Sequence, residues 1–313
     1  MKKLRLKVIS AIIAILGVLG LTRFWQSPMP LDSTVFNSLY SEPDKVTEGP
    51  LKVYHLGHSL VARDMPAMLQ QLAGSEHDYR SQLGWGTPLK AHYEDDVEIN
   101  GFDEENNHPN FQPAFEAMST GEYDALIVTE MIELQASIDY FDSHLYLHKW
   151  ANEARAGNPN IRVFLYETWD FLNVADGWLS RLDSDLPDLW EKQILRRALA
   201  LEDNPKPIYI IPGGQVMAKF VRHIESAGGL HGIDNRNDLF TDDIHFNDYG
   251  AYLMALTHYA VLYQRSPIGL PYALLKADGS PAQNPGQELA TLMQQIVWEV
   301  VTSYDKTGVT LAP

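Results

Sequence analysis

The sequence predicts an α/β protein in which helices cover both faces of a central parallel sheet. Strand-like runs, most of them apolar, span residues 52–56, 79–83, 125–129, 161–166 and 207–211. Helical patterns separate most of these runs, and parallel strands require such crossovers to bring the chain back to the same end of the sheet. Continuous apolar strands are typical of sheets that are buried on both sides.

Helical periodicity accounts for most of the chain between and after these strands. We expect helices over residues 64–73, 144–156, 187–200, 216–227, 249–263 and 287–304. Asp64 is a candidate N-cap for the first of them. Pro187 would lie in the first turn of its helix, where a missing amide hydrogen is tolerated. The globular domain is therefore predicted to span residues 51–313 and to end in a C-terminal helix.

The N-terminus has the pattern of a targeting segment. An apolar stretch, residues 8–21, follows four basic residues, Lys2, Lys3, Arg5 and Lys7. It is shorter than the ~20 residues that a spanning helix needs. Residues 1–25 are predicted to be a cleaved signal peptide or an N-terminal membrane anchor, in which residues 8–25 contact the inner membrane. Both alternatives place the domain outside the cytoplasm, as a periplasmic, secreted or anchored protein.

Residues 26–50 are predicted to be a linker, because prolines interrupt a polar stretch that has no sustained periodicity. The whole chain of 313 residues carries 41 acidic and 24 basic side chains, a formal net charge of -17. This charge argues against a nucleic-acid partner, which needs a basic face. The chain contains no cysteine, which excludes disulfides, a thiolate nucleophile and cysteine-ligated metals.

A serine follows the first strand directly, in the tetrapeptide Gly57-His58-Ser59-Leu60. A glycine at this point permits the sharp turn that presents a hydroxyl at the edge of the sheet. The serine by itself could equally cap the next helix or stabilise a turn. A second motif, Asp242-Asp243-Ile244-His245, stands far along the chain. Its carboxylate can orient the imidazole three residues later, as a Ser-His-Asp triad requires.

The two motifs resemble the GDSL block and the D-x-x-H block of SGNH/GDSL esterases, in that family's order. The resemblance covers roughly residues 51–264. It implies a three-layer α/β/α sandwich of flavodoxin-like type, ester hydrolysis and no cofactor. By the same resemblance, Ser59 is the nucleophile, His245 the general base and Asp242 its orienting partner.

The oxyanion hole of this family combines three donors. They are the backbone N–H of the serine, a glycine N–H from a second block and an asparagine side chain from a third. The resemblance implies Ser59 for the first and Gly86 for the second, with Gly84 as the alternative. Donors of this kind each contribute about 2.7–4 kcal/mol to transition-state stabilisation.

The third block departs from the family, because no asparagine follows the strand at residues 125–129 and Glu130 stands near the expected position. An ionised carboxylate cannot donate a hydrogen bond and would repel an oxyanion. Three alternatives remain open. Glu130 is structural or binds polar groups of the substrate, burial keeps it neutral, or Gln135 supplies the third donor.

Aromatic and polar residues at the ends of other strands could form a sugar-binding wall or could simply pack in their loops. The candidates are Trp85, Glu130, Glu167, Trp169 and Gln215. A metal site could be assembled from His55, His58, His92, Asp95 and His245, but none of the usual ligand spacings is present and we predict no metal.

The sequence therefore predicts a serine esterase that removes acyl groups, acetyl above all, from a carbohydrate or other extracytoplasmic ester. Two alternatives stay open. An O-acyltransferase would use the same triad, and a non-catalytic carbohydrate-binding protein would keep the fold without the chemistry. Nothing in the sequence indicates the oligomeric state.

Overall fold

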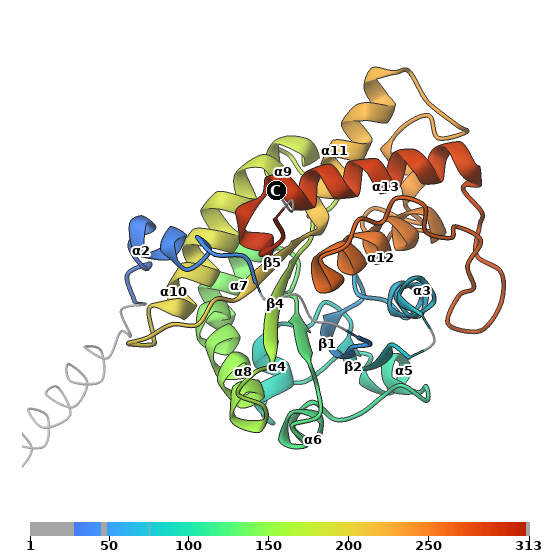
Figure 1. Cartoon of the computed structure of the whole chain (residues 1–313). Coiled ribbons are helices and arrows are strands. Elements are labelled where there is room, and N and C mark those ends of the chain that lie inside the picture. The colour runs from blue at the N-terminus through green and yellow to red at the C-terminus, as the bar shows by residue number, and fades with distance from the viewer. Residues whose placement is uncertain (1–27, 45–48, 75, 311–313) are drawn as a thin grey trace, which may run out of the picture.

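The computed structural model describes residues 28–44, 49–74 and 76–310, and its centre is a parallel sheet of five strands (Figure 1). The strand order is β2-β1-β3-β4-β5, the flavodoxin-like order of doubly wound folds. The strands are β1 Lys52–His58, β2 Asp78–Gly84, β3 Ala125–Val128, β4 Arg162–Glu167 and β5 Tyr209–Pro212. The predicted α/β class and parallel sheet are confirmed.

Helices form a layer on each side of the sheet (Figure 1). One layer contains α3 Asp64–Ala73, α12 Asp248–Tyr263 and α13 Gly286–Ser303, with α11 Gly213–Ser226 packed against the last two. The other contains α4 Leu89–Tyr93, α6 Ala114–Ser119, α8 Ser143–Gly157 and α10 Arg196–Leu199. Helix α12 is buried almost all round because it lies under both α3 and α13.

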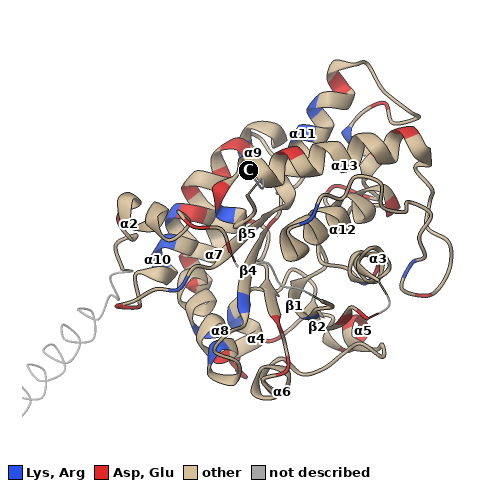
Figure 2. Ribbon diagram, in the orientation of Figure 1, with Lys and Arg blue, Asp and Glu red and all other residues tan. Residues whose placement is uncertain are grey.

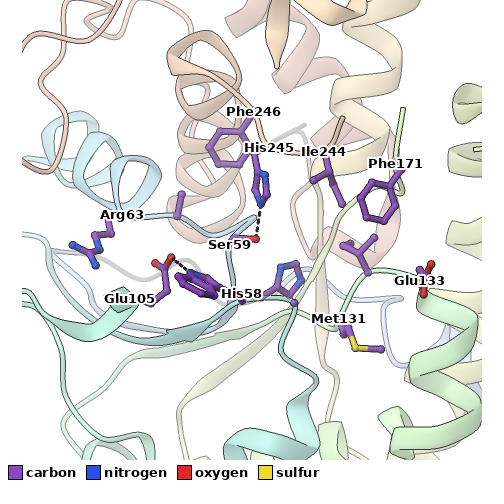
Figure 3. A pocket seen from close by; sticks show the side chains of 14 residues that line it. His58, Ser59, Arg63, Glu105, Met131, Glu133, Phe171, Ile244, His245 and Phe246 are labelled. Carbon is purple, nitrogen blue, oxygen red and sulfur yellow. Dashed lines mark hydrogen bonds between the residues drawn. The ribbon is translucent and has the colours of Figure 1, made fainter. Parts of the chain in front are cut away.

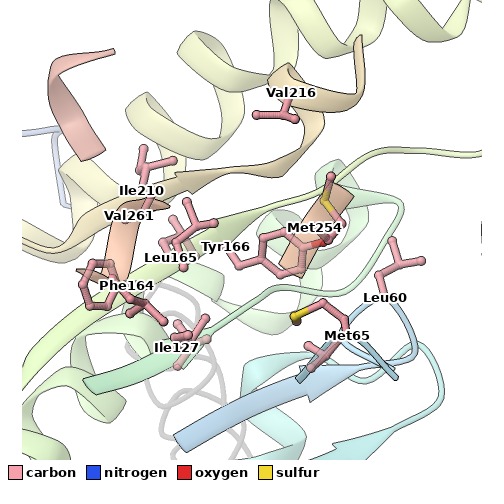
Figure 4. Close-up of a cluster of buried hydrophobic side chains, with 14 of the residues drawn as sticks. Leu60, Met65, Ile127, Phe164, Leu165, Tyr166, Ile210, Val216, Met254 and Val261 are labelled. Atoms are coloured by element: carbon pink, nitrogen blue, oxygen red, sulfur yellow. The ribbon is translucent and has the colours of Figure 1, made fainter. Parts of the chain in front are cut away.

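The core lies between the sheet and these helices. Every residue of β3 and of β5 is buried, as the continuous apolar runs predict. Figure 4 shows strand side chains such as Ile127, Leu165 and Ile210 in one cluster with Met254 and Val261 of α12. Because the strands pack against α12 in this way, the ends of the strands and the loops that follow them have fixed positions.

The helix predicted for residues 187–200 begins earlier than the sequence suggests. A helical run starts with α9 Trp178–Asp185, continues as the π-helical segment η1 Leu186–Leu195 and ends in α10. Pro187 therefore lies inside the run and not in its first turn. Proline has no amide hydrogen to donate to the preceding turn. The helical run continues past Pro187 in the wider π-helical hydrogen-bond pattern.

Part of the segment predicted as a linker packs on the domain. Helix α2 Ser33–Ser38 follows Asp32, whose carboxylate accepts the amide of Thr34 at 2.8 Å. The Phe36 and Tyr40 side chains are buried, and the Tyr40 hydroxyl donates to the carbonyl of Ile208 at 2.7 Å. The aromatic residues make this packing favourable despite the prolines around them.

Several short helices do not appear among the expected ones. They include α4 and α6, α5 Phe102–Asn106, α7 Leu134–Phe141 and the 3₁₀ turn η2 Arg236–Leu239; a further 3₁₀ turn, η3 Asp305–Thr307, follows α13. Short helices of this kind carry too little periodicity for a sequence pattern to reveal.

The predicted signal peptide or anchor, residues 1–25, lies outside the described residues. Within residues 28–44, 49–74 and 76–310, no helix has the length and apolar character needed to span a bilayer. Figure 2 shows basic segments scattered among acidic ones and not gathered over one element.

Gly57 in β1 provides a test of how tightly β1 packs on β3. A Cβ atom on Gly57 would come within 2.6 Å of the Thr129 Cγ2 atom. We expect Gly57→Ala to lower the free energy of unfolding by about 1–3 kcal/mol through overpacking. In a Thr129→Ser background, which removes that methyl group, the loss should shrink by more than half in urea unfolding. An unchanged loss in the double variant would contradict this contact as the cause.

Candidate active site

The carboxyl end of β1 is the topological switch point of the sheet. The crossover from β1 to β2 uses α3 on one face, whereas the crossover from β2 to β3 uses α4 and α6 on the other. Open α/β sheets bind ligands at such a point, because the two loops diverge and leave a crevice. Ser59 follows β1 directly and therefore stands in this crevice.

Three side chains from the two motifs meet there. The His245 Nε2 atom lies 2.8 Å from the Ser59 Oγ atom (Figure 3). The His245 Nδ1 atom lies 2.7 Å from Asp242 Oδ2. With Nδ1–H donating to the carboxylate, Nε2 is unprotonated and can accept the serine hydroxyl hydrogen. The geometry is that of a nucleophile, a base and the group that orients the base.

A tight turn presents the Asp242 carboxylate to the imidazole. Its Oδ1 atom accepts the amides of Ile244 at 2.9 Å and His245 at 2.7 Å, which leaves Oδ2 for the ring. Desolvation opposes ionisation, but the hydrogen bonds from His245 and Ile244 outweigh it and lower the pKa of Asp242 to about 2. The buried Trp169 indole donates a hydrogen bond to the Ile244 carbonyl at 2.9 Å, which holds this turn in place.

His58 ties the loop that carries Ser59 to the segment after β3. Its Nδ1 atom accepts the Leu60 amide at 3.3 Å, so Nε2 carries the hydrogen and donates to the Glu130 carbonyl at 2.7 Å. Burial lowers the pKa of His58 to about 4, which keeps the ring neutral at neutral pH. The residue thus links the ends of β1 and β3 beside Ser59.

His92 makes a second link of the same kind. Its Nδ1 atom accepts the Gln82 side-chain amide at 3.0 Å, and its Nε2–H donates to the Gly57 carbonyl at 2.9 Å. Burial also lowers the pKa of His92 to about 4. Two neutral histidines therefore hold the backbone around Ser59, each with a defined tautomer.

The two backbone amides predicted as oxyanion donors, those of Ser59 and Gly86, have no hydrogen-bond acceptor in the described part of the chain. Both residues line one cavity, and Gly86 has a φ of +54°, a conformation that favours glycine. Gly84, the alternative, does not line it: a Cβ there would come within 2.2 Å of the Thr87 hydroxyl.

Glu130, near the position expected for asparagine, points away from the cavity. Its Oε1 atom accepts the amides of Met131 at 2.8 Å and Leu89 at 3.2 Å, so the carboxyl joins the loop after β3 to the first residue of α4. The side chain is fully buried, and burial raises its pKa. Gln135, the other candidate, donates to Asp139 at 2.9 Å on the surface of α7.

The cavity in front of Ser59 has a volume of about 920 Å³ and the size of a typical small-molecule site. Its walls come from loops at the ends of several strands. Figure 3 shows Met131, Phe171 and Ile244 on one side of the Ser59–His245 pair and Arg63 and Glu105 on the other. No asparagine or glutamine side chain lines it within the described ranges.

The structure separates the predicted substrate-binding residues. Trp85 lines the cavity, is half exposed and donates from its indole to Glu105 at 2.8 Å. Trp169 and Glu167 are buried outside it, and the Glu167 carboxylate accepts the Gln215 backbone amide at 3.2 Å and side-chain amide at 3.1 Å. These contacts stabilise the first turn of α11.

Several cavity residues escaped the sequence analysis. Ile244 and Phe246 flank His245, and Phe171 stands two residues after Trp169 in the loop after β4. The buried indole of Trp169 donates to the Ile244 carbonyl, whereas the Phe171 ring is partly exposed at the cavity, and residue type alone does not distinguish the two aromatic residues of that loop. Met131 and Ile132 carry no chemical signal that a sequence could reveal.

The candidate metal ligands are not assembled into a metal site. Across residues 28–44, 49–74 and 76–310, no group of three or more histidine, aspartate or glutamate side chains is placed to hold a metal ion. His58, His92 and His245 instead use their ring nitrogens in the hydrogen bonds given above.

The sequence matches no model of a known protein family and no curated protein. The structure is similar to that of a DUF4886 family protein from Bacteroides uniformis, with 16% identity, a TM-score of 0.50 and coverage of 81% of this chain and 95% of that one. At this identity the likeness indicates a shared fold alone.

Two further solved structures are similar at lower TM-scores. One, from Parabacteroides merdae, is described as a GDSL-like lipase, with 11% identity, a TM-score of 0.44 and coverage of 70% of this chain and 99% of that one. The other is the lipase Lip_vut3 from a goat rumen metagenome, with 14% identity, a TM-score of 0.37 and coverage of 67% and 96%.

The bridging carboxyl of Glu130 can be tested by paired substitutions. Glu130→Ala leaves the buried amides of Leu89 and Met131 unpaired, and we expect it to lower the free energy of unfolding by about 2–4 kcal/mol. Glu130→Gln keeps one acceptor oxygen and should cost less than about 1.5 kcal/mol. Urea unfolding measures both; equal losses would show that the carboxyl oxygen does not act as this bridge.

Glu167 should make stability depend on pH. Burial raises its pKa to about 8, from an ordinary value of 4.5. Between these values the unfolded chain releases a proton that the folded protein retains, so stability falls as pH rises, by up to about 1.4 kcal/mol per pH unit. Urea unfolding between pH 5 and 8 should show a shallower decline for Glu167→Gln. The control Glu299→Gln, on an exposed residue, should keep the wild-type slope; matching slopes for all three proteins would refute the assignment.

Proposed function

We propose that this chain is a serine ester hydrolase. Ser59 is the nucleophile, His245 the general base and Asp242 the carboxylate that orients the base. The observation that carries the proposal is the unbroken line of hydrogen bonds from Asp242 Oδ2 through the imidazole to Ser59 Oγ, at 2.7 and 2.8 Å. This line opens into a cavity of ligand size at the switch point of the sheet.

In the first half of the reaction, Ser59 Oγ attacks the ester carbonyl carbon and His245 Nε2 takes the hydroxyl proton. The ionised Asp242 stabilises the imidazolium that forms. When the tetrahedral intermediate collapses, the bond to the alcohol oxygen breaks and the imidazolium returns its proton to that oxygen. The acyl group is then held on Ser59 as an ester.

In the second half, water takes the place of the alcohol. His245 Nε2 accepts a proton from the water as its oxygen attacks the acyl carbon. Collapse of this second intermediate breaks the bond to Ser59 Oγ, which recovers its proton from the imidazolium. The products are the carboxylic acid and the free enzyme, so protons and bonds balance without a cofactor.

The oxyanion would be held by the amides of Ser59 and Gly86, which have no acceptor among the described residues. Oriented backbone donors stabilise the charge that develops in the transition state. The asparagine of the SGNH pattern has no counterpart at Glu130, whose carboxyl is occupied elsewhere. With two backbone donors and no asparagine, we expect a lower kcat than an oxyanion hole with three donors would give.

For the substrate, we propose a small acyl group, acetyl in the simplest case, on a carbohydrate or similar ester outside the cytoplasm. Apolar side chains around Ser59, including Met131 and Ile244, suit the hydrocarbon part of an ester. The basic and apolar pattern of residues 1–25 supports export. An acyltransferase would use the same triad with a sugar hydroxyl in place of water.

The activity test compares wild-type protein with Ser59→Ala on p-nitrophenyl acetate. We expect Ser59→Ala to lower kcat by at least about 10³-fold, because the acyl-enzyme can no longer form. The control Ser226→Ala removes a hydroxyl whose hydrogen bond is to the His223 carbonyl at the end of α11, and it should keep the wild-type rate.

Equal rates for wild type and Ser59→Ala would overturn both the hydrolase and the acyltransferase, and would favour a non-catalytic protein on this fold. If the rates differ, adding a sugar acceptor separates the two enzymes. A hydrolase releases acetate in proportion to p-nitrophenol, whereas an acyltransferase releases less acetate and forms an acetylated sugar.

A further inference from the structure

A second hollow continues from the cavity in front of Ser59. Its volume is about 460 Å³, and it shares Glu133 and Phe171 with the first cavity. Figure 3 shows both of these residues on the same side of Ser59, beyond Ile244 and Met131. The remaining lining residues come from α7, α9 and the loop after β4: Gln135, Ala136, Asp170, Asn173, Val174 and Arg181. We refer to this hollow as the side groove.

Hydrogen bonds join the loop after β4, which lines the side groove, to the turn that contains Asp242 and Asp243. The Leu172 amide donates to the Asp243 carbonyl at 2.8 Å, and the Asn173 side-chain amide donates to the Asp243 carboxylate at 3.2 Å. Asp243 is the neighbour of Asp242 in the turn that orients His245. A molecule held in the groove is therefore held in a defined position relative to Ser59 Oγ.

The polar groups of the groove offer acceptors to hydroxyl hydrogens. Gln135 and Asn173 donate from their nitrogens to Asp139 and Asp243, and in the described part of the chain their amide oxygens have no hydrogen-bond partner. Amide and carboxylate oxygens at fixed positions, beside a flat ring such as Phe171, can bind both the hydroxyls and the C–H faces of a neutral polyol.

The charges of the groove argue against an anionic ligand. Arg181 is held by Asp185 at 2.9 Å and lies 3.4 Å from Asp170, so its charge is neutralised twice. Glu133 adds another carboxylate at the junction with the first cavity. A purely hydrocarbon ligand would leave these polar groups without water or partners, which is unfavourable. The ligand that fits is neutral and rich in hydroxyl groups.

We infer that the side groove binds the alcohol part of the substrate and that this alcohol is a saccharide. The inference rests on the proposed function, because it takes the bond cleaved at Ser59 to be an ester. Acyl groups of simple esters are hydrocarbon, so the hydroxyl-rich part that suits the groove must be the alcohol. The sugar-binding surface is thus formed by Phe171 and Asn173 and not by Trp169, Glu167 and Gln215.

The experiment fills the groove and measures saccharide binding without turnover. In a Ser59→Ala background, binding of maltotriose, cellotriose and chitotriose is followed by calorimetry. Val174→Trp places an indole in the groove, and we expect it to weaken binding of the preferred trisaccharide at least about tenfold. Val35→Trp, on the exposed surface of α2, is the matched control and should bind as the parent does.

A kinetic measurement accompanies the binding measurement, with Ser59 intact and thermal unfolding used to show that each variant is folded. The ratio of kcat/KM for an acetylated trisaccharide to kcat/KM for p-nitrophenyl acetate should fall at least about tenfold in Val174→Trp and stay constant in Val35→Trp. The fall should come chiefly from a higher KM, because the groove contributes binding and not chemistry.

The outcomes separate the two proposals. If no trisaccharide binds, or if folded Val174→Trp binds and discriminates as Val35→Trp does, the side groove is not a saccharide site. If Val174→Trp blocks binding but wild type and Ser59→Ala act equally on both esters, the groove binds saccharide and the esterase proposal fails.

Discussion

The pairing of β1 with β2 on one side and β3 on the other is the constraint on which the rest of the site depends. The crossover from β1 to β2 passes over one face of the sheet, and the crossover from β2 to β3 passes over the other. The loops at the carboxyl end of β1 therefore separate and expose Ser59. The same end of the sheet carries the loop after β4, which supplies Phe171 to the cavity and Trp169 to the turn that holds Asp242.

Buried groups that are neutral or have a raised pKa hold the loops around Ser59. His58 and His92 each donate one hydrogen bond to a backbone carbonyl beside Ser59 or at the end of β3. Glu130 accepts the amide of Met131 in the loop after β3 and the amide of Leu89 at the start of α4. Because burying a polar group without a partner is costly, the hydrogen bonds of His58 and His92 and those to Glu130 Oε1 favour these loop positions. Glu130, which stands near the position predicted for an asparagine, is thus part of the scaffold.

Much of the fold could be predicted from the sequence, because apolar runs and helical periodicity report burial directly. All five strands and most long helices lie where those patterns indicate. Around Pro187 the pattern was insufficient, since a π-helical segment lets the helix continue through the proline. In residues 28–44 the prolines suggested a linker, whereas burial of Phe36 and Tyr40 against the domain decided otherwise.

For the site, the sequence by itself determined the chemical groups: a serine after the first strand, an Asp-x-x-His turn and the absence of an asparagine near Glu130. These follow from residue type and local spacing. Only the tertiary structure decided which groups face the cavity, because that depends on the direction of each side chain at a loop. It turned Glu130, Glu167 and Trp169 inward, left Gly86 and Phe171 at the surface of the cavity, and joined the cavity to a polar groove from α7 and α9.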